Sequence, residues 1–237
     1  MVRKIGIVIA GILLLLFLFS FIRFGWIGGM IVIIIYILVG AIALYESFLL
    51  PMTNPANPRI ASPFLYDTIT ALLPGHDVES LSSIVDRVGI RGGMRVLEIG
   101  SGTGWFSIRI AQIMDLRIDG VDVCEKMLKR AREKAVRSGA EVNFHLGSAE
   151  NLEFRDSTFD VVCAIYCMNV VHDKDVALGE MVRVTKPSGK VAIYVPKPLF
   201  SHMLDGKIYA EKMCDLGLKD VRVDEINLTS LLIHGRK

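Results

Sequence analysis

A run of residues near the middle of the chain has the pattern of a ligand-binding turn between a strand and a helix. The apolar residues 96–99 lead directly into Gly100-Ser101-Gly102-Thr103-Gly104, and a helix-forming run begins at once. Glycines at alternate positions allow unusual backbone dihedrals and let a ligand touch the main chain. The free N–H groups at the start of a helix suit an anionic group. The pattern therefore favours a ligand-binding loop over a plain tight turn.

Two carboxylates flank this glycine loop in the sequence. Glu98 lies two residues before the first glycine, and Asp122 ends the next apolar run, about 20 residues after the glycines, the position that binds ribose hydroxyls in nucleotide-binding folds. The dinucleotide fingerprint requires a third glycine at the sixth position, where this chain has Trp105. Asp122 thus favours a ligand with ribose hydroxyls, and a nicotinamide oxidoreductase is a distant alternative.

The elements expected around the loop alternate between helix and strand. We expect helices over residues 80–88, 105–114, 125–138, 176–184 and 207–216, and strands over residues 95–99, 117–123, 141–146, 160–165, 190–195, 221–226 and 230–234, with a turn at 186–189. Such alternation predicts an α/β fold with a largely parallel sheet covered by helices on both faces. The last two strands are close enough in sequence to form an antiparallel pair.

The N-terminal part of the chain differs sharply in composition. Mean hydropathy is +0.46 over 237 residues, and residues 1–50 contain only four charged residues. The uncharged runs 5–22 and 26–45 each approach the roughly 20 helical residues that span a bilayer. We therefore predict a two-span transmembrane hairpin over residues 1–46; a cleaved signal peptide is the alternative. Arg3 and Lys4 favour a cytoplasmic start, so both ends of the hairpin are expected in the cytoplasm.

A proline-rich linker and N-terminal cap are expected over residues 47–75, and a globular domain over residues 76–237. The charges outside residues 1–50 balance at 24 basic and 24 acidic, which disfavours nucleic acid as a partner. The four cysteines form no CxxC pair, so we expect reduced thiols and no metal site. Collagen, coiled coil and wholesale disorder are excluded by composition.

Four segments in order resemble those of class I S-adenosylmethionine (SAM)-dependent methyltransferases, in particular the ubiquinone and menaquinone biosynthesis type. They are VLEIGSGTG, GVDVCEKML, GSAENLEFRDSTFDVV and EMVRVTKPSGKVAIY, within residues 90–195. The resemblance implies a Rossmann-like sheet of seven strands, mostly parallel, whose last strand inserts antiparallel. It also implies SAM as the cofactor.

The resemblance further implies roles for individual residues. The loop of Gly100, Ser101, Gly102 and Gly104 would pass under the methionyl part of SAM, and Glu98 would orient its ammonium group. Asp122 would hold the ribose hydroxyls, with Val123 against the adenine. Ser148 and Ala149 occupy the segment at the adenine edge, and Ile165 lies where the fourth strand passes the cofactor. Ser148 stands where the family usually has aspartate, and Asn169-Val170 where it often has two histidines.

Residues that could serve the methyl acceptor are less sharply marked. Asn169 and His172 follow the fourth strand and are the candidate catalytic residues; a surface or capping role is the alternative for His172. Tyr66 and Tyr166 are candidate lid and acceptor-contacting residues, and Tyr66-Asp67 resembles a pair that precedes the domain in quinone-type relatives.

The sequence as a whole predicts a methyltransferase in the cell membrane, acting on a small, lipid-soluble acceptor such as a lipid, quinone or isoprenoid, with the lipid bilayer as its partner. The alternatives are a soluble or protein acceptor, or a SAM-binding membrane protein without catalysis. The acceptor atom, the general base and the oligomeric state stay open.

Overall fold

The computed structural model describes residues 62–71, 76–197 and 206–237, together with Met30 and Ile34, which are helical. The chain divides into two compact units, residues 1–51 and 52–237. The predicted hairpin over residues 1–46 lies outside the described residues apart from those two positions. Within the described ranges, no helix combines the length and the apolar character needed to cross a membrane.

The second unit is built on a single sheet of seven strands in the order β3-β2-β1-β4-β5-β7-β6. All neighbouring pairs from β3 to β5 are parallel, whereas β7 is antiparallel to both β5 and β6. The strands are β1 (Arg95–Ile99), β2 (Arg117–Asp122), β3 (Val142–Leu146), β4 (Phe159–Ile165), β5 (Thr185–Pro196), β6 (Lys219–Asn227) and β7 (Ser230–Arg236). This is the predicted seven-stranded Rossmann-like sheet, with one antiparallel strand inserted near its end.

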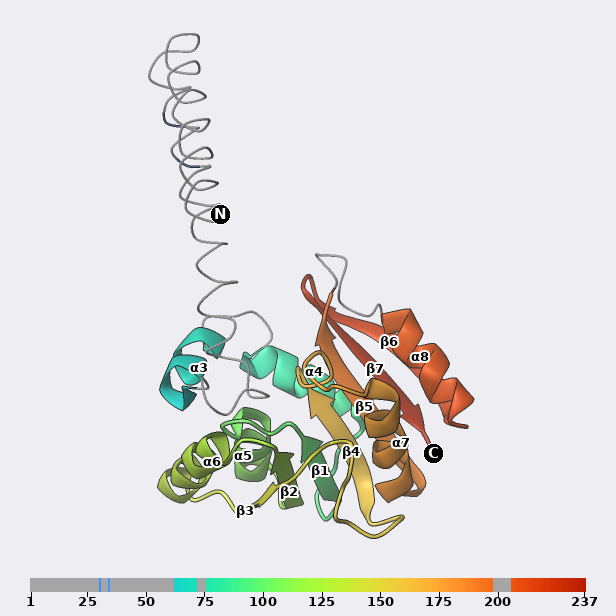
Figure 1. Cartoon of the computed structure of the whole chain (residues 1–237), viewed down its shortest axis with the longest axis horizontal. Coiled ribbons are helices and arrows are strands. Elements are labelled where there is room, and N and C mark those ends of the chain that lie inside the picture. The colour runs from blue at the N-terminus through green and yellow to red at the C-terminus, as the bar shows by residue number, and fades with distance from the viewer. Residues whose placement is uncertain (1–29, 31–33, 35–61, 72–75, 198–205) are drawn as a thin grey trace, which may run out of the picture. The chain divides into compact units, whose positions relative to one another are not determined.

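Six described helices accompany the sheet (Figure 1). They are α3 (Pro63–Thr70), α4 (Val78–Val88), α5 (Trp105–Ile113), α6 (Glu125–Ser138), α7 (Lys174–Val184) and α8 (Gly206–Asp215). Helix α4 begins where the Asp77 side chain accepts a hydrogen bond from Ser80 N, and it ends at Gly89 in the left-handed region. Asp173 caps α7 in the same way, through the N–H groups of Asp175 and Val176.

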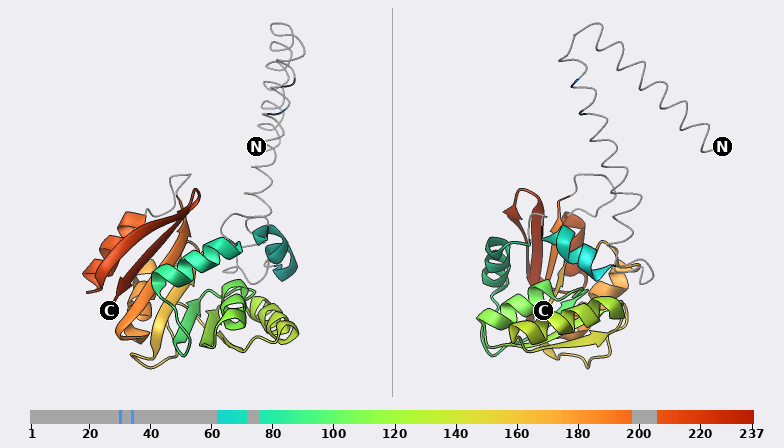
Figure 2. Two further views of the ribbon diagram at one scale, coloured as in Figure 1. Left: turned by 180° about the vertical axis from the view of Figure 1, so that it is seen from behind. Right: turned by 90° about the vertical axis from the view of Figure 1, so that its left-hand side faces the viewer.

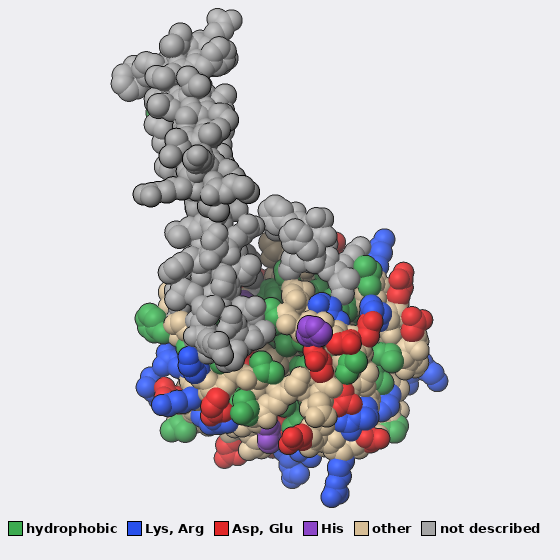
Figure 3. Space-filling view, in the orientation of Figure 1, with side chains coloured by type: hydrophobic (Ala, Val, Ile, Leu, Met, Phe, Trp, Pro, Cys, Tyr) green, Lys and Arg blue, Asp and Glu red, His purple; other side chains and the backbone are tan. Residues whose placement is uncertain are grey.

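The side chains of β4 show how the core divides into two layers. Val161, Cys163 and Ile165 pack with α4 and α5 on one face of the sheet. Val162 and Ala164 point to the opposite face and pack with α7 and α8. Because both faces are covered, the central strands are apolar throughout rather than alternating. Figure 2 shows the two helical layers from behind and from the side, and Figure 3 shows basic and acidic side chains interspersed over one face of the surface.

Two local features differ from the sequence-based expectation. Residues 186–189, expected as a turn, are an irregular stretch of β5, because Ser188 N donates to Lys237 O and Lys237 N donates to Gly189 O. The end of the chain thus holds this stretch in the sheet. Helix α3 lies within the segment expected to be linker and cap; its first residue is Pro63, whose fixed φ suits the first position of a helix.

Candidate functional site at the carboxyl edge of the sheet

The glycine loop lies at the carboxyl end of β1, where open α/β sheets bind their ligands. Gly100 has φ +66°, and a Cβ atom there would lie 2.1 Å from Cys167 Sγ. Gly104 has φ +78°, and its Cβ would lie 2.9 Å from Ile108 and from Phe144. Glycine is therefore required at both positions by backbone conformation and by close packing. The loop is fixed in place between β1, the turn after β4 and helix α6.

Glu98 is buried at the end of β1, directly beneath the loop. Its Oε2 accepts a hydrogen bond from Ser107 N at 3.1 Å and a short one from Ser107 Oγ, both in the first turn of α5. Burial raises the pKa of Glu98 to about 8, the two Ser107 hydrogen bonds oppose the rise, and the nearby Asp122 carboxylate adds to it. An ammonium group beside this buried carboxyl would stabilise its charged form.

Asp122 ends β2 and holds the glycine loop from the other side. Its Oδ2 accepts a hydrogen bond from Gly102 N at 2.8 Å, and its Oδ1 accepts one from Cys124 N at 2.8 Å. Burial raises the pKa of Asp122, and the two backbone donors counteract that rise. Each carboxylate oxygen can accept more than one hydrogen bond. Asp122 can therefore fix the loop and still receive a ligand hydroxyl.

Helix α3 is fastened to the loop through Asp67. Its Oδ1 accepts from Thr103 Oγ1 at 2.6 Å and from Lys134 Nζ at 2.9 Å, and its Oδ2 accepts from Arg130 Nε at 3.1 Å. Burial alone would raise the pKa of Asp67, but the hydrogen bonds from Thr103, Lys134 and Arg130 outweigh it and lower the pKa. This network joins α3, the loop and α6.

Tyr66, the neighbour of Asp67, lies over the loop. Its ring packs with Cys124 and Met127, and its hydroxyl oxygen is 3.7 Å from a Cβ built on Gly102. Burial raises the pKa of the Tyr66 hydroxyl, and the carboxylates Asp122 and Glu98 raise it further. Tyr66 thus lies beside both of the acids that flank the loop, where a lid residue is expected.

The other residues expected at the cofactor lie along the same edge. Ser101 is buried and its Oγ has no hydrogen-bond partner in the described structure. Val123 is 46% exposed although it directly follows the buried Asp122. Ser148 Oγ accepts from Glu150 N, and Ala149 is buried beside it. Ile165 is buried at the end of β4.

The residues expected at the acceptor are less uniformly placed. Tyr166 follows β4 with φ +55°, a conformation that is strained for a non-glycine residue, and its hydroxyl lies 2.8 Å from Ser230 Oγ. Asn169 is half-buried in the turn that follows. His172 is exposed and immediately precedes the helix cap Asp173. The structure brings Tyr166 toward the core, while His172 lies at the surface.

Two contact residues had no expected role in the sequence. Cys167 Sγ packs against Gly100, and burial raises the pKa of this thiol to about 12. His76, just before α4, stacks on Tyr166. Neither lies in a recognisable motif, so only their three-dimensional neighbours reveal them. All four cysteines are free, as expected, with Cys214 exposed.

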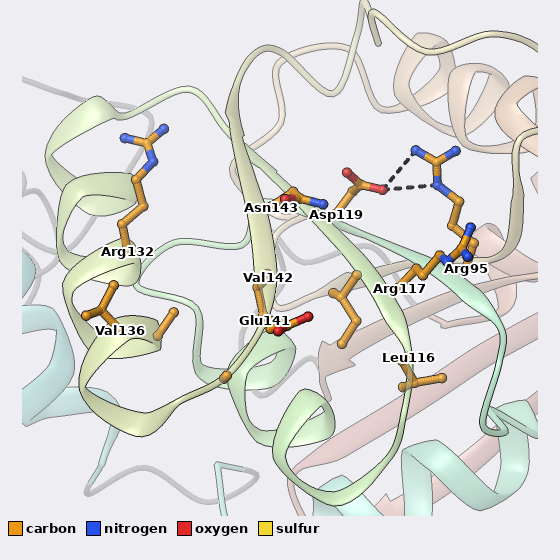
Figure 4. Close-up of a pocket in the computed structure, with 12 residues that line it drawn as sticks. Arg95, Leu116, Arg117, Asp119, Arg132, Val136, Glu141, Val142 and Asn143 are labelled. Carbon is orange, nitrogen blue, oxygen red and sulfur yellow. Dashed lines mark hydrogen bonds and ion pairs between the residues drawn. The ribbon is translucent and has the colours of Figure 1, made fainter.

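An open groove of about 830 Å³ lies at the opposite edge of the sheet (Figure 4). It is lined by the first residues of β1, β2 and β3 and by the end of α6, including Arg95, Arg117 and Glu141. In this groove Arg95 is paired with Asp119, with 3.1 Å between Nη2 and Oδ2. Because ligands of such sheets bind at the carboxyl ends of the strands, we place the functional site at the glycine loop rather than here.

The segment that holds the glycine loop also matches known proteins. Residues 96–189 match the family model described as "Methyltransferase domain". The ubiquinone/menaquinone biosynthesis C-methyltransferase UbiE of Vibrio vulnificus is 35% identical over 130 residues, which are 53% of this chain and 49% of that protein. UbiE of Shewanella halifaxensis is 32% identical over 162 residues, covering 63% of this chain and 64% of that protein. The chain thus spans about half to two thirds of the length of these curated relatives.

Solved structures share the fold. A SAM-dependent methyltransferase from Aquifex aeolicus matches with a TM-score of 0.64 at 21% identity, covering 74% of this chain and 98% of that one. Phosphoethanolamine N-methyltransferase 2 of Haemonchus contortus, solved with SAM, matches with a TM-score of 0.64 at 18% identity, covering 82% of this chain and 59% of that one. Residues 96–189 thus match the methyltransferase-domain family model, and the solved structures share the fold of the chain.

Proposed function

We propose that this protein is a membrane-anchored methyltransferase that transfers the methyl group of SAM to a carbon of a small, lipid-soluble acceptor of the quinone type. The observation that carries the proposal is the glycine loop held between the buried carboxyls Glu98 and Asp122. The identity of 32–35% to the UbiE C-methyltransferases supports the acceptor class. The two long apolar runs before residue 46 support the anchor.

The residues of the carboxyl edge fit SAM chemically. Glu98 is a buried carboxyl without a cationic partner in the described structure, and it suits the ammonium group of the cofactor. Asp122 suits the ribose hydroxyls, and the exposed Val123 offers an apolar surface to the adenine. Ser101 Oγ, buried and unpaired, gives a further polar contact. When bound, SAM supplies a methyl group already activated by a positively charged sulfur.

The protein's own task is then to position the acceptor and to exclude water. Asp67 holds α3 on the loop, which places Tyr66 over the cofactor edge. Transfer to a ring carbon releases the proton of that carbon, so a group or a water molecule near the end of β4 has to accept it. His172 stays a candidate for this role although it is exposed, whereas the neutral amide of Asn169 is not a base and stays a candidate for positioning the acceptor or that water molecule by hydrogen bonds.

We propose a cell-membrane location with two spans and with the N-terminus and catalytic domain in the cytoplasm. Cys214 is a native reporter, because it is exposed whereas Cys124 and Cys163 are buried. In spheroplasts, a membrane-impermeant maleimide should label the protein only after the membrane is opened. Labelling of intact spheroplasts that disappears in Cys214→Ala would contradict this topology.

Methyl transfer is tested with the full chain in lipid nanodiscs and methyl-labelled SAM. A prenylated naphthoquinol without a ring methyl group is added, and the label should move into the lipid extract on that compound. Label in the aqueous or protein fraction would favour a soluble or protein acceptor instead. SAM binding by calorimetry without transfer to any fraction would favour a protein that binds SAM without catalysis.

A further inference from the structure

Three aromatic side chains gather beside the glycine loop. The His76 ring stacks on the Tyr166 ring with centroids 4.9 Å apart and an interplanar angle of 13°. The rings of Trp105 and His76 meet in an edge arrangement with centroids 5.0 Å apart. The rings of Tyr166 and Tyr194 do the same with centroids 4.8 Å apart. These distances and angles are those of favourable aromatic pairs. The three rings therefore form one continuous aromatic surface, which we call the aromatic wall (His76, Trp105 and Tyr166).

The aromatic wall is tied to the cofactor edge on two sides. Trp105 directly follows Gly104, the last glycine of the loop. Tyr166 directly precedes Cys167, whose side chain packs against Gly100. His76, Trp105 and Tyr166 are only partly buried, so another ring can cover part of the wall. The wall thus borders the glycine loop at its first and its last glycine.

Two polar atoms of the aromatic wall differ in whether they have a hydrogen-bond partner. The Tyr166 hydroxyl lies 2.8 Å from Ser230 Oγ, which holds the ring in place. His76 Nδ1 is buried and has no hydrogen-bond partner in the described structure. A buried polar atom without a partner costs free energy, so it calls for an explanation. A ligand hydroxyl that reaches Nδ1 removes that cost.

His76 is a neutral imidazole over the physiological range. Burial lowers its pKa to about 4, while the neighbouring Asp77 carboxylate acts in the opposite direction. A neutral imidazole carries one donor and one acceptor nitrogen. Because a phenolic hydroxyl both donates and accepts, it can bond to Nδ1 in either tautomer of His76.

We propose that His76, Trp105 and Tyr166 form the acceptor subsite, which takes a planar aromatic ring bearing a hydroxyl group and bonds that hydroxyl through His76 Nδ1. The inference rests on the proposed function and assigns its acceptor to particular residues. Ring stacking supplies affinity for any flat acceptor, and Nδ1 selects the reduced, hydroxylated form over the oxidised quinone when it acts as the acceptor nitrogen.

The chain contains two tryptophans, Trp26 and Trp105, so Trp26→Phe leaves Trp105 as the only indole reporter. In this background the full chain in nanodiscs is titrated with 1,4-dihydroxynaphthalene, kept reduced, in the presence of S-adenosylhomocysteine. We expect saturable quenching of Trp105 fluorescence. His76→Phe keeps a ring but lacks Nδ1 and should weaken the binding of this probe by about 10-fold, the loss of one buried hydrogen bond.

Three further measurements test whether a loss of probe binding is specific to the aromatic wall. His145→Gln removes a half-exposed histidine on β3 and should leave probe binding unchanged. Calorimetry with S-adenosylhomocysteine should give the same affinity in His76→Phe as in the parent, which shows that the loop is intact. Tetramethylammonium, a probe for a cation-binding aromatic site, should not displace the naphthoquinol.

The outcomes separate this inference from the proposed function. If the parent methylates the quinol and His76→Phe binds and methylates it equally well, the subsite is wrong and the function stands. If the parent binds the quinol through His76 and transfers no methyl group to it, the subsite stands and the function is wrong. Displacement by tetramethylammonium would overturn the assignment of a neutral aromatic acceptor.

Discussion

The two sides of the carboxyl edge are built in different ways. On the cofactor side, the glycine loop is held by carboxylates close in sequence: Glu98 bonds to Ser107, 9 residues away, and Asp122 bonds to Gly102, 20 residues away. On the acceptor side, aromatic rings that are far apart in the sequence meet, as with His76 and Tyr166, which are 90 residues apart. The first side, which we call the cofactor cradle (Glu98, residues 100–104 and Asp122), is polar and is built from residues close in sequence. The second side, the aromatic wall, is built from residues far apart in sequence. One short stretch of the sequence can supply most of the cofactor site, whereas the proposed acceptor site needs residues from several distant stretches.

The largest effect that tests this contrast is expected at Gly100. In Gly100→Ala the new Cβ would meet Cys167 Sγ at 2.1 Å, in addition to the strain of φ +66°. The loop has to move, and we expect SAM affinity to fall by about 100-fold or more, equivalent to ~3 kcal/mol. Isothermal calorimetry on the full chain measures the loss.

Gly139→Ala is the matched control for Gly100→Ala. Gly139 has nearly the same φ, +68°, but nothing lies within 4 Å of its added Cβ. This variant should lose about 1–2 kcal/mol of stability from the backbone conformation alone and keep its SAM affinity. Equal loss of SAM affinity in both variants would show that the close contact with Cys167 is irrelevant.

The next effect concerns the pH dependence of stability through Glu98. The folded pKa of about 8 lies above the ordinary value of 4.5, so the folded protein favours the protonated acid. The resulting stability is fully present below about pH 4.5 and is lost as the pH rises through 8, at ~1.4 kcal/mol per unit. Melting temperatures of the wild type should therefore fall between about pH 5 and 9.

Glu98→Gln keeps an acceptor for Ser107 but cannot titrate, so its melting temperature should fall less over the same range. Asp122 titrates in both proteins, so the difference between the two curves reports Glu98 together with its electrostatic coupling to Asp122. Adding S-adenosylhomocysteine, whose ammonium group favours the charged form of Glu98, should flatten the wild-type curve. A pH dependence identical in wild type and Glu98→Gln would mean that Glu98 is already ionised in the folded protein.

A smaller effect is expected where the cofactor side meets α3. Asp67→Asn removes the charge that pairs with Arg130 and Lys134, and α3 should detach from Thr103. We expect SAM affinity to fall by about 10-fold, since a half-buried paired charge contributes on the order of 1–2 kcal/mol. Hydrogen exchange over residues 63–70 should rise together with the dissociation constant.

Asp175→Asn breaks the ion pair with Lys212, in which Asp175 is 67% exposed, and is the control for Asp67→Asn. Such a surface pair contributes little, so neither SAM affinity nor exchange in α3 should change. If Asp67→Asn behaves like this control, α3 does not help to hold the cofactor.

The same contrast explains what the sequence could and could not predict. The seven strands and the places of Glu98, Gly100 and Asp122 follow from local signals: apolar runs, glycine spacing and an acid at a strand end. The insertion of the antiparallel last strand is implied by the resemblance to class I methyltransferases. The local signals work because the groups that interact lie within a few residues or within one strand-helix unit. The fold therefore matches the expectation closely on the cofactor side.

The features that the sequence did not predict all depend on distant partners. The role proposed for His76 depends on its stacking contact with Tyr166, which lies 90 residues later in the chain. Residues 186–189 have the composition of a turn, yet Lys237 pairs with them and keeps them in β5. No local pattern encodes such contacts.

The smallest effects should come from two tyrosines outside the glycine loop, Tyr166 of the aromatic wall and Tyr209 of α8. Tyr166→Phe removes the hydroxyl that bonds to Ser230, at a cost of about 1 kcal/mol of stability. Tyr209 is fully buried on α8, and its hydroxyl has no partner in the described structure. Tyr209→Phe therefore removes an unsatisfied polar group and should be neutral or stabilising.

Urea unfolding of both variants, with SAM binding measured in parallel, tests the division between the two sides. If the aromatic wall is separate from the cofactor cradle, both variants keep the SAM affinity of the parent within about twofold, because additivity holds for sites that share no partners. Only Tyr166→Phe should weaken the binding of the quinol, since a loosened Tyr166 ring no longer supports His76. Reduced SAM affinity in Tyr166→Phe would instead mean that the wall and the loop act as one site, joined through Cys167 and Gly100.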